Sequence, residues 1–120
     1  MMTKNEESLG KLFGAQLVKS LIDIQATKVL RRLVPEALCH TETGGVVGRL
    51  LLGLEDGEAH PFNLNDLRRL DPILQDECLL VIALDGTAML KVRQRIERDD
   101  NGRVVWALLN SMWAPKQPNA

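Results

Sequence analysis

Two cysteines and two histidines are the first residues to consider as a metal site: Cys39, His40, His60 and Cys78. Structural zinc sites usually take their ligands in tight pairs, about two to five residues apart. Here Cys39 and His40 are adjacent, while 19 and 17 residues separate the later candidates. We therefore expect no metal and no cofactor. A Cys39–His60 nucleophile pair is equally unsupported, because the sequence indicates no third group to orient it.

Glu77 is the one carboxylate whose position could support acid–base catalysis. On a helical wheel it falls among Ile73 and Leu80, and a carboxylate in apolar surroundings has a raised pKa and can act as a general acid. The alternative is an ion pair with Arg68, Arg69 or an arginine of the C-terminal segment, and we favour it. No second acid is placed opposite Glu77 by the sequence, so we predict a protein that is not an enzyme.

The charge is unevenly distributed along the chain. The formal net charge is −1, but residues 41–86 carry three basic and nine acidic side chains, whereas residues 1–40 have a net charge of +2 and residues 87–120 of +3. An acidic surface speeds association with a basic partner through long-range attraction. A solvated acidic surface without a partner is the simpler alternative. The candidate protein-binding residues in this middle segment are Asp66, Arg68, Asp76 and Glu77.

A basic cluster near the C-terminus is the alternative candidate, as a phosphate-binding patch of a small nucleic-acid-associated regulator. Its members are Lys91, Arg93, Arg95 and Arg98. The near-neutral total charge and the 3% aromatic content argue against it, because nucleic-acid binders usually show a basic excess or a base-stacking platform. We therefore favour a protein partner over a nucleic acid.

The elements that must position these residues are predicted to be helices. Apolar residues recur at three- and four-residue spacing in the first 22 residues and define an amphipathic helix: Leu9, Leu12, Phe13, Leu17 and Leu21, with Ile24 just beyond. Gly10 and Gly14 each weaken this helix by about 1 kcal/mol. It therefore needs a packing partner, either the rest of the chain or a second subunit in a homodimer.

Two further helices precede the acidic stretch. One is predicted over residues 23–39, with a kink or restart at Pro35. The next covers residues 44–54, with Thr43 as N-cap and Gly57 as a left-handed C-cap. Within it, Gly48 and Gly53 are interpreted as close-packing positions on a buried helix.

Residues 61–86 are predicted to form a loop, a short helix and a long helix. Asn63 or Asn65 caps the short helix, and Asp71 followed by Pro72 starts the long one. The long helix, residues 73–84, is apolar on most sides, so we expect it to be the buried centre of the fold.

Residues 89–106 allow two interpretations. Helical spacing of apolar residues continues there, but Asp100-Asn101-Gly102 after alternating apolar residues also fits a small β-hairpin. A final helix holds Trp106 and Trp113, and residues 115–120 form a frayed tail.

Several motifs resemble a family of small uncharacterised proteins encoded on bacterial plasmids and integrative elements. The resemblance covers about residues 23–113 and departs from the family pattern at Gly45 and Gln75. It rests on the following residues: Thr43, Gly44, Leu51, Leu52, Gly53, Leu54, Phe62, Leu64, Asp66, Leu67, Leu70, Asp71, Asp76, Glu77, Cys78, Leu79, Leu84 and Asp85, with a W-x-x-L-x-x-x-W ending. It implies a mobile-element context and no mechanism.

Together these patterns predict a mainly α protein, a compact bundle of four to five helices around residues 73–84, with residues 23–114 as a single domain. No apolar stretch approaches the ~18 residues that span a bilayer, and no secretory leader is seen, so we expect a cytoplasmic protein with reduced thiols. The expected function is that of a non-enzymatic accessory protein of a mobile element, which binds another protein and could thereby inhibit or modulate a host system.

Overall fold

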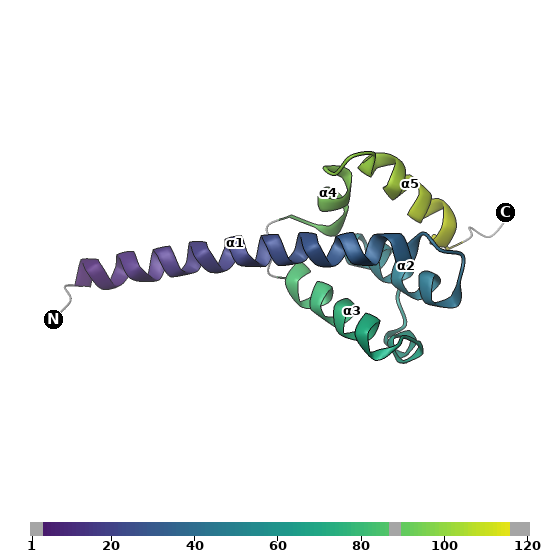
Figure 1. The fold of residues 1–120 in the computed structure, drawn as a ribbon, viewed down its shortest axis with the longest axis horizontal. Helices are drawn as coiled ribbons and strands as arrows, with labels where there is room; N and C mark the ends of the chain where they lie inside the picture. The colour runs from purple at the N-terminus through teal and green to yellow at the C-terminus, as the bar shows by residue number, and fades with distance from the viewer. Residues whose placement is uncertain (1–3, 87–89, 116–120) are drawn as a thin grey trace.

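The computed structural model describes residues 4–86 and 90–115, with side chains from residue 17 onward in these ranges. Helices account for most of these residues, and none of them is in a strand. The elements in chain order are α1 (Lys4–Ala37), α2 (Glu42–Glu55), the 3-10 helix η1 (Leu64–Arg69), α3 (Pro72–Asp85), α4 (Val92–Glu97) and α5 (Gly102–Trp113). Figure 1 shows α1 as a long rod whose C-terminal half is surrounded by the other helices.

The first helix is continuous where the sequence analysis predicts two helices. Residues 1–22 and 23–39 were expected to be separate, yet α1 runs without a break from Lys4 to Ala37 with Pro35 inside it. No residue near position 22 removes a backbone donor, so the hydrogen-bond ladder continues. Pro35 lies only two residues before the helix end, where the loss of one hydrogen bond disrupts little.

The second helix begins and ends at residues other than those predicted. Thr41, not Thr43, is its N-cap, and the Thr41 hydroxyl accepts a hydrogen bond from the Gly44 amide at 2.9 Å. At the other end Asp56 is the C-cap, and no glycine of the described residues has a positive φ, so Gly57 is not a left-handed cap. The Asp56 carboxylate instead closes the following turn by accepting from the Glu58 and Ala59 amides.

The caps predicted for η1 and α3 are confirmed. The Asn63 side chain accepts from the Asn65 amide at 3.0 Å. Asp71 accepts from the Leu74 amide at 3.0 Å, and Pro72 occupies the first turn of α3, where its missing N–H removes no hydrogen bond.

The prediction that residues 73–84 form the buried centre is wrong. Only Cys78 and Val81 of α3 are buried, and Ile73 and Leu79 are 73% and 48% exposed. Helix α3 packs along α1, with Leu74, Leu80 and Ile82 partly buried against the core, and it leaves Ile73 and Leu79 at the surface. The largely apolar residues 73–84, which lack a clear helical periodicity, thus form a helix at the periphery of the fold and not its centre.

The buried centre is α2, which is enclosed by α1, α3 and α5. Its buried residues are Gly44, Gly45, Val46, Val47, Gly48, Leu50, Leu51 and Leu52. The absence of side chains at its glycines lets neighbours approach closely: a Cβ at Gly48 would overlap the Trp113 ring, and one at Gly53 would lie 2.9 Å from the His60 carbonyl oxygen. The prediction of close packing at Gly48 and Gly53 is therefore confirmed.

The C-terminal third is helical, and the described residues contain no hairpin. Val92–Glu97 and Gly102–Trp113 are α4 and α5, and the Asp100-Asn101-Gly102 sequence forms the turn between them. Asn101 has a left-handed φ of 60°, as in the predicted turn, but the flanking segments are helices. The predicted frayed tail comprises residues 115–120, and all of it except Pro115 lies outside the described residues.

None of the described helices is both long and apolar enough to cross a membrane.

Candidate functional site

The basic residues predicted as a phosphate-binding patch do not share one surface. Arg95 is only 3% exposed, and its Nη1 donates to the carboxylate of Asp23 and, at 3.3 Å, to the Asp23 carbonyl oxygen. This hydrogen bond lowers the pKa of the Asp23 carboxyl. Arg98 joins the same cluster, with Nη2 3.8 Å from Asp23 and 3.4 Å from the Thr27 hydroxyl. These two arginines therefore hold α4 against α1, and Arg95 lies in the interior.

The other two cations lie on a different side of α4. Arg93 donates to Glu97 at 2.9 Å, which raises the pKa of Arg93, and its guanidinium lies 5.6 Å from the centre of the Trp106 ring. Lys91 donates through Nζ to the Glu55 carbonyl oxygen at 3.3 Å. Each predicted phosphate-binding residue thus has a partner within the protein.

Glu77 forms an ion pair, although with a residue that the sequence analysis did not name. Its Oε1 accepts from Arg32 Nε of α1 at 2.6 Å, and its side chain is 18% exposed. Arg32 can reach Glu77 because α3 packs along α1. The sequence pattern does not indicate that these two helices are neighbours.

Asp66 belongs to a charged network between η1 and α2. It lies 3.7 Å from Arg69 of its own helix and 4.0 Å from Arg49 of α2. Arg69 also lies 3.3 Å from Glu42 at the start of α2. Arg68 is exposed. Of the four predicted protein-binding residues, Asp66 and Glu77 are thus partly buried and serve internal contacts.

Asp76 is exposed on the solvent side of α3, between two exposed apolar residues. Ile73, Asp76 and Leu79 are spaced three residues apart, so they lie along the side of the helix away from buried Cys78 and Val81. We call these three residues the outer α3 face. Asp76 is a candidate from the sequence, whereas Ile73 is predicted to be in the core; the three-residue spacing of Ile73, Asp76 and Leu79 is the signal that could have revealed this face.

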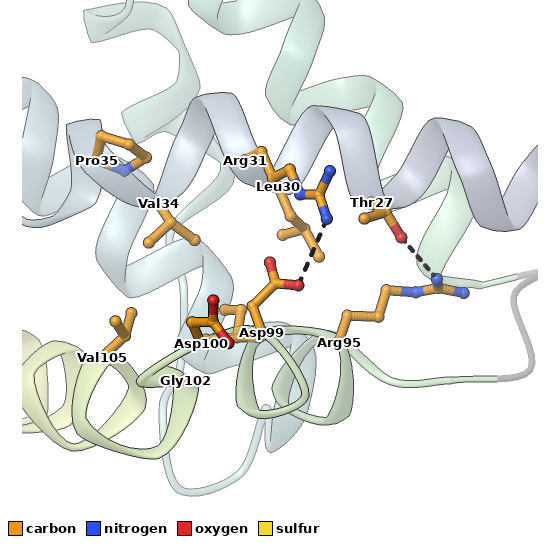
Figure 2. A pocket seen from close by; sticks show the side chains of 11 residues that line it. Thr27, Leu30, Arg31, Val34, Pro35, Arg95, Asp99, Asp100, Gly102 and Val105 are labelled. Carbon is orange, nitrogen blue, oxygen red and sulfur yellow. Dashed lines mark hydrogen bonds and ion pairs between the residues drawn. The ribbon is translucent and has the colours of Figure 1, made fainter.

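A small cavity lies between α1 and the α4–α5 turn (Figure 2). Its volume is about 190 Å³, and Leu30 and Val34 of α1 face Val105 of α5 across it. Arg31 and Asp99 meet at its edge, 3.6 Å apart. These apolar walls suit an aliphatic group.

A larger, polar cleft lies on the other side of α4. Its volume is about 700 Å³, and its lining includes Glu55, His60, Arg93 and Trp106. Glu55 Oε2 and His60 Nδ1 are buried there without a hydrogen-bond partner among the described residues. The described lining also includes two further acids, Asp56 and Glu97.

The four residues considered as a zinc set are dispersed. Cys39 is exposed after α1, while Cys78 is buried in α3, where burial raises the pKa of its thiol to about 11. His40 lies beside the Trp113 ring, with centroids 6.0 Å apart, and His60 lines the polar cleft. Within residues 4–86 and 90–115 no group of three or more His, Cys, Asp or Glu side chains could hold a metal ion.

Asp85 links the end of α3 to the start of α4. Its carboxylate accepts a hydrogen bond from the Val92 amide, while burial raises the pKa of this carboxyl above its usual range. The Leu-Asp ending of α3 therefore positions the next helix.

Comparison with known proteins places this fold in a family. The chain matches no curated protein and no solved structure. Residues 27–114 match a family of unknown function, DUF7673, and this range runs from the last third of α1 to the end of α5. The match covers well over half of the 120 residues. The chain therefore belongs to the DUF7673 family.

Proposed function

We propose that this protein is a non-enzymatic accessory protein that binds another protein through the outer α3 face. The observation that carries the proposal is the exposure of Ile73 and Leu79 on either side of Asp76. Apolar residues exposed together on one helix face are typical of protein-interaction sites.

The charge of the surrounding segment supports a partner with basic and apolar character. Residues 41–86, which include α2, η1 and α3, have a net charge of −6. Leu64, at the start of η1, is 71% exposed and adds apolar surface near the beginning of α3. A basic partner would be attracted at long range and would then bury the apolar residues.

The biological setting is part of the same proposal. The motifs that resemble plasmid-encoded proteins support a bacterial mobile element as the source, and an acidic domain of this size suits an inhibitor or modulator of a host system acting in the cytoplasm. The unpaired cysteines are compatible with a reducing compartment.

The experiment is photocrosslinking in bacterial cells with a photoreactive residue at Asp76. We expect a crosslinked partner that is lost in the Ile73→Ser/Leu79→Ser variant, and binding that weakens as the salt concentration rises. The fold should tolerate these changes because both side chains are exposed.

The matched control is Val104→Ser/Leu108→Ser, which removes similarly exposed side chains, 59% and 47%, from α5. This variant should retain the crosslink. If no crosslink forms at low salt, or if both variants lose it equally, the outer α3 face is not the binding site.

A further inference from the structure

The small cavity between α1 and the α4–α5 turn has apolar walls (Figure 2). Leu30 and Val34 of α1 line one side, and Ile96 of α4 and Val105 of α5 line the other. Leu30 and Ile96 belong to the buried core, and Val34 and Val105 pack against it. A hydrocarbon chain placed between these walls would leave water, which favours its binding.

Arg95 forms a polar end of this cavity. Its side chain reaches from α4 to α1, where Nη1 donates to the Asp23 carboxylate and lies 3.4 Å from the Thr27 hydroxyl (Figure 2). Arg95 is only 3% exposed, and its Nη2 is buried without a hydrogen-bond partner among the described residues. Because an unpaired buried donor is costly, an acceptor oxygen at this end of the cavity would be stabilising.

The charges around Arg95 favour an acceptor that is negatively charged. Arg95 and Arg98 share the carboxylate of Asp23, with Arg98 Nη2 at 3.8 Å, so these three side chains have one positive charge in excess. At the edge of the cavity, Arg31 and Asp99 lie 3.6 Å apart and neutralise each other. A carboxylate beside Arg95 would balance the excess charge, whereas an ammonium group would add a third cation.

The dimensions of the cavity match a short chain. Thr27 and Pro35 both line it, and their positions on α1 are about 12 Å apart along the helix axis at 1.5 Å per residue. Asp100 lies beside Gly102, away from the Arg95 end, so a negative head group is favoured only at Arg95 (Figure 2). The volume of about 190 Å³ exceeds the ~150 Å³ of a cavity that holds benzene, which leaves room for a tail of about five carbons.

We propose that this cavity binds a short aliphatic carboxylate, with its head group at Arg95 and its tail between Val34 and Val105. Such a ligand contacts α1 on one side and α4 and α5 on the other. It therefore stabilises the packing of these helices, because a molecule that binds only the folded state raises the free energy of unfolding. The site shares no residue with the outer α3 face.

The test is a titration of the isotope-labelled full chain with hexanoate, followed by two-dimensional NMR. We expect saturable shifts of the amide signals of Val34 and Val105, with a Kd on the order of 1 mM or lower for a ligand this small. From acetate to hexanoate the affinity should rise by up to about four-fold per methylene. Neutral hexanamide should bind at least several-fold more weakly than hexanoate, and hexylamine should cause no saturable shift.

A cavity-filling substitution provides the matched pair of variants. Val105→Phe should weaken hexanoate binding at least about ten-fold, because the tail loses its apolar contacts. Its neighbour Val104 is 59% exposed and does not line the cavity, so Val104→Phe should bind hexanoate like the wild type. Val34→Leu adds volume from the opposite wall and should also weaken binding, which keeps the test decisive if Val105→Phe does not fold.

Three results would overturn the proposal. They are the lack of a saturable shift with any of these carboxylates, hexylamine binding as tight as that of hexanoate, and unchanged hexanoate binding in the folded cavity-filling variants. Ile73→Ser/Leu79→Ser should bind hexanoate normally, so the outcome is separate from that of the crosslinking experiment on the outer α3 face.

Discussion

Replacing Gly48 with alanine should loosen the contact between α2 and α5. The indole of Trp113 lies directly over Gly48, and its Nε1 donates a hydrogen bond of 2.7 Å to the Ala37 carbonyl oxygen. A Cβ at position 48 would overlap the ring, with Nε1 at 2.7 Å and Cγ at 2.9 Å. The rigid indole would have to move, and its hydrogen bond to the end of α1 would be lost.

The expected cost follows from three contributions. Overpacking costs about 1–3 kcal/mol, and loss of the hydrogen bond costs about 1 kcal/mol. Alanine returns about 1 kcal/mol of helix propensity. The free energy of unfolding should therefore fall by about 1–3 kcal/mol. At roughly 4 °C per kcal/mol for a chain of this length, the Tm should fall by about 4–12 °C.

Thermal unfolding followed by far-ultraviolet circular dichroism measures this change, with Gly14→Ala as the matched control. Gly14 is also inside a helix, but a Cβ there meets nothing, so in dilute solution its substitution should stabilise the protein slightly. Gly48→Ala should also cost little stability once Trp113→Ala has removed the indole. If Gly48→Ala unfolds at or above the wild-type temperature, the proposed overlap with Trp113 is refuted.

Three further predictions concern charged and thiol groups. Asp23→Asn should destabilise the protein more than Arg95→Met, because it leaves the buried Arg95 guanidinium without its counter-ion. Urea unfolding at neutral pH measures both losses, and an Asp23→Asn loss no larger than that of Arg95→Met would contradict this reasoning. Burial raises the pKa of Asp85, so the folded state binds this proton more tightly than the unfolded state does. The free energy of unfolding therefore declines as the pH rises from the ordinary carboxyl pKa of 3.8 through the raised pKa of folded Asp85. Asp85→Asn should stabilise the protein at neutral pH but not below pH 3.8, and unfolding measured across this pH range tests the difference. Iodoacetamide should label Cys39 in the native protein and Cys78 only after unfolding, because Cys78 is buried with a pKa of about 11, and rapid native labelling of Cys78 in mass spectra would contradict its position.

The first residues of some helices could be predicted from the sequence, because a capping side chain bonds to a backbone amide only two or three residues later. Asp71 and Pro72 start α3, and Asn63 caps η1, as expected. The start of α2 could be predicted only approximately from the sequence, because Thr41 and Thr43 are both suitable N-cap residues near that position. Gly44 decides between them, since its amide bonds to Thr41 and its missing Cβ leaves room for the Cys39 carbonyl oxygen.

The candidate binding surface could be predicted only in part. Asp76 was identified, but Ile73 and Leu79 were assigned to a buried helix. Hydrophobicity indicates that an apolar side chain tends to be buried, but it does not indicate which helix other helices will surround. The same limit applies to Arg95, whose charge predicted an exposed site although it pairs with Asp23, 72 residues earlier in the chain.

The sequence by itself determined that the chain is helical, where its turns lie and that its first helix has an apolar stripe, because hydrogen bonding at caps and apolar spacing are local properties. Only the tertiary structure decided that α2 rather than α3 is central, since the glycines of α2 let the neighbouring helices approach. It also decided which charges are buried and which apolar residues remain at the surface, because both depend on contacts between segments far apart in the chain.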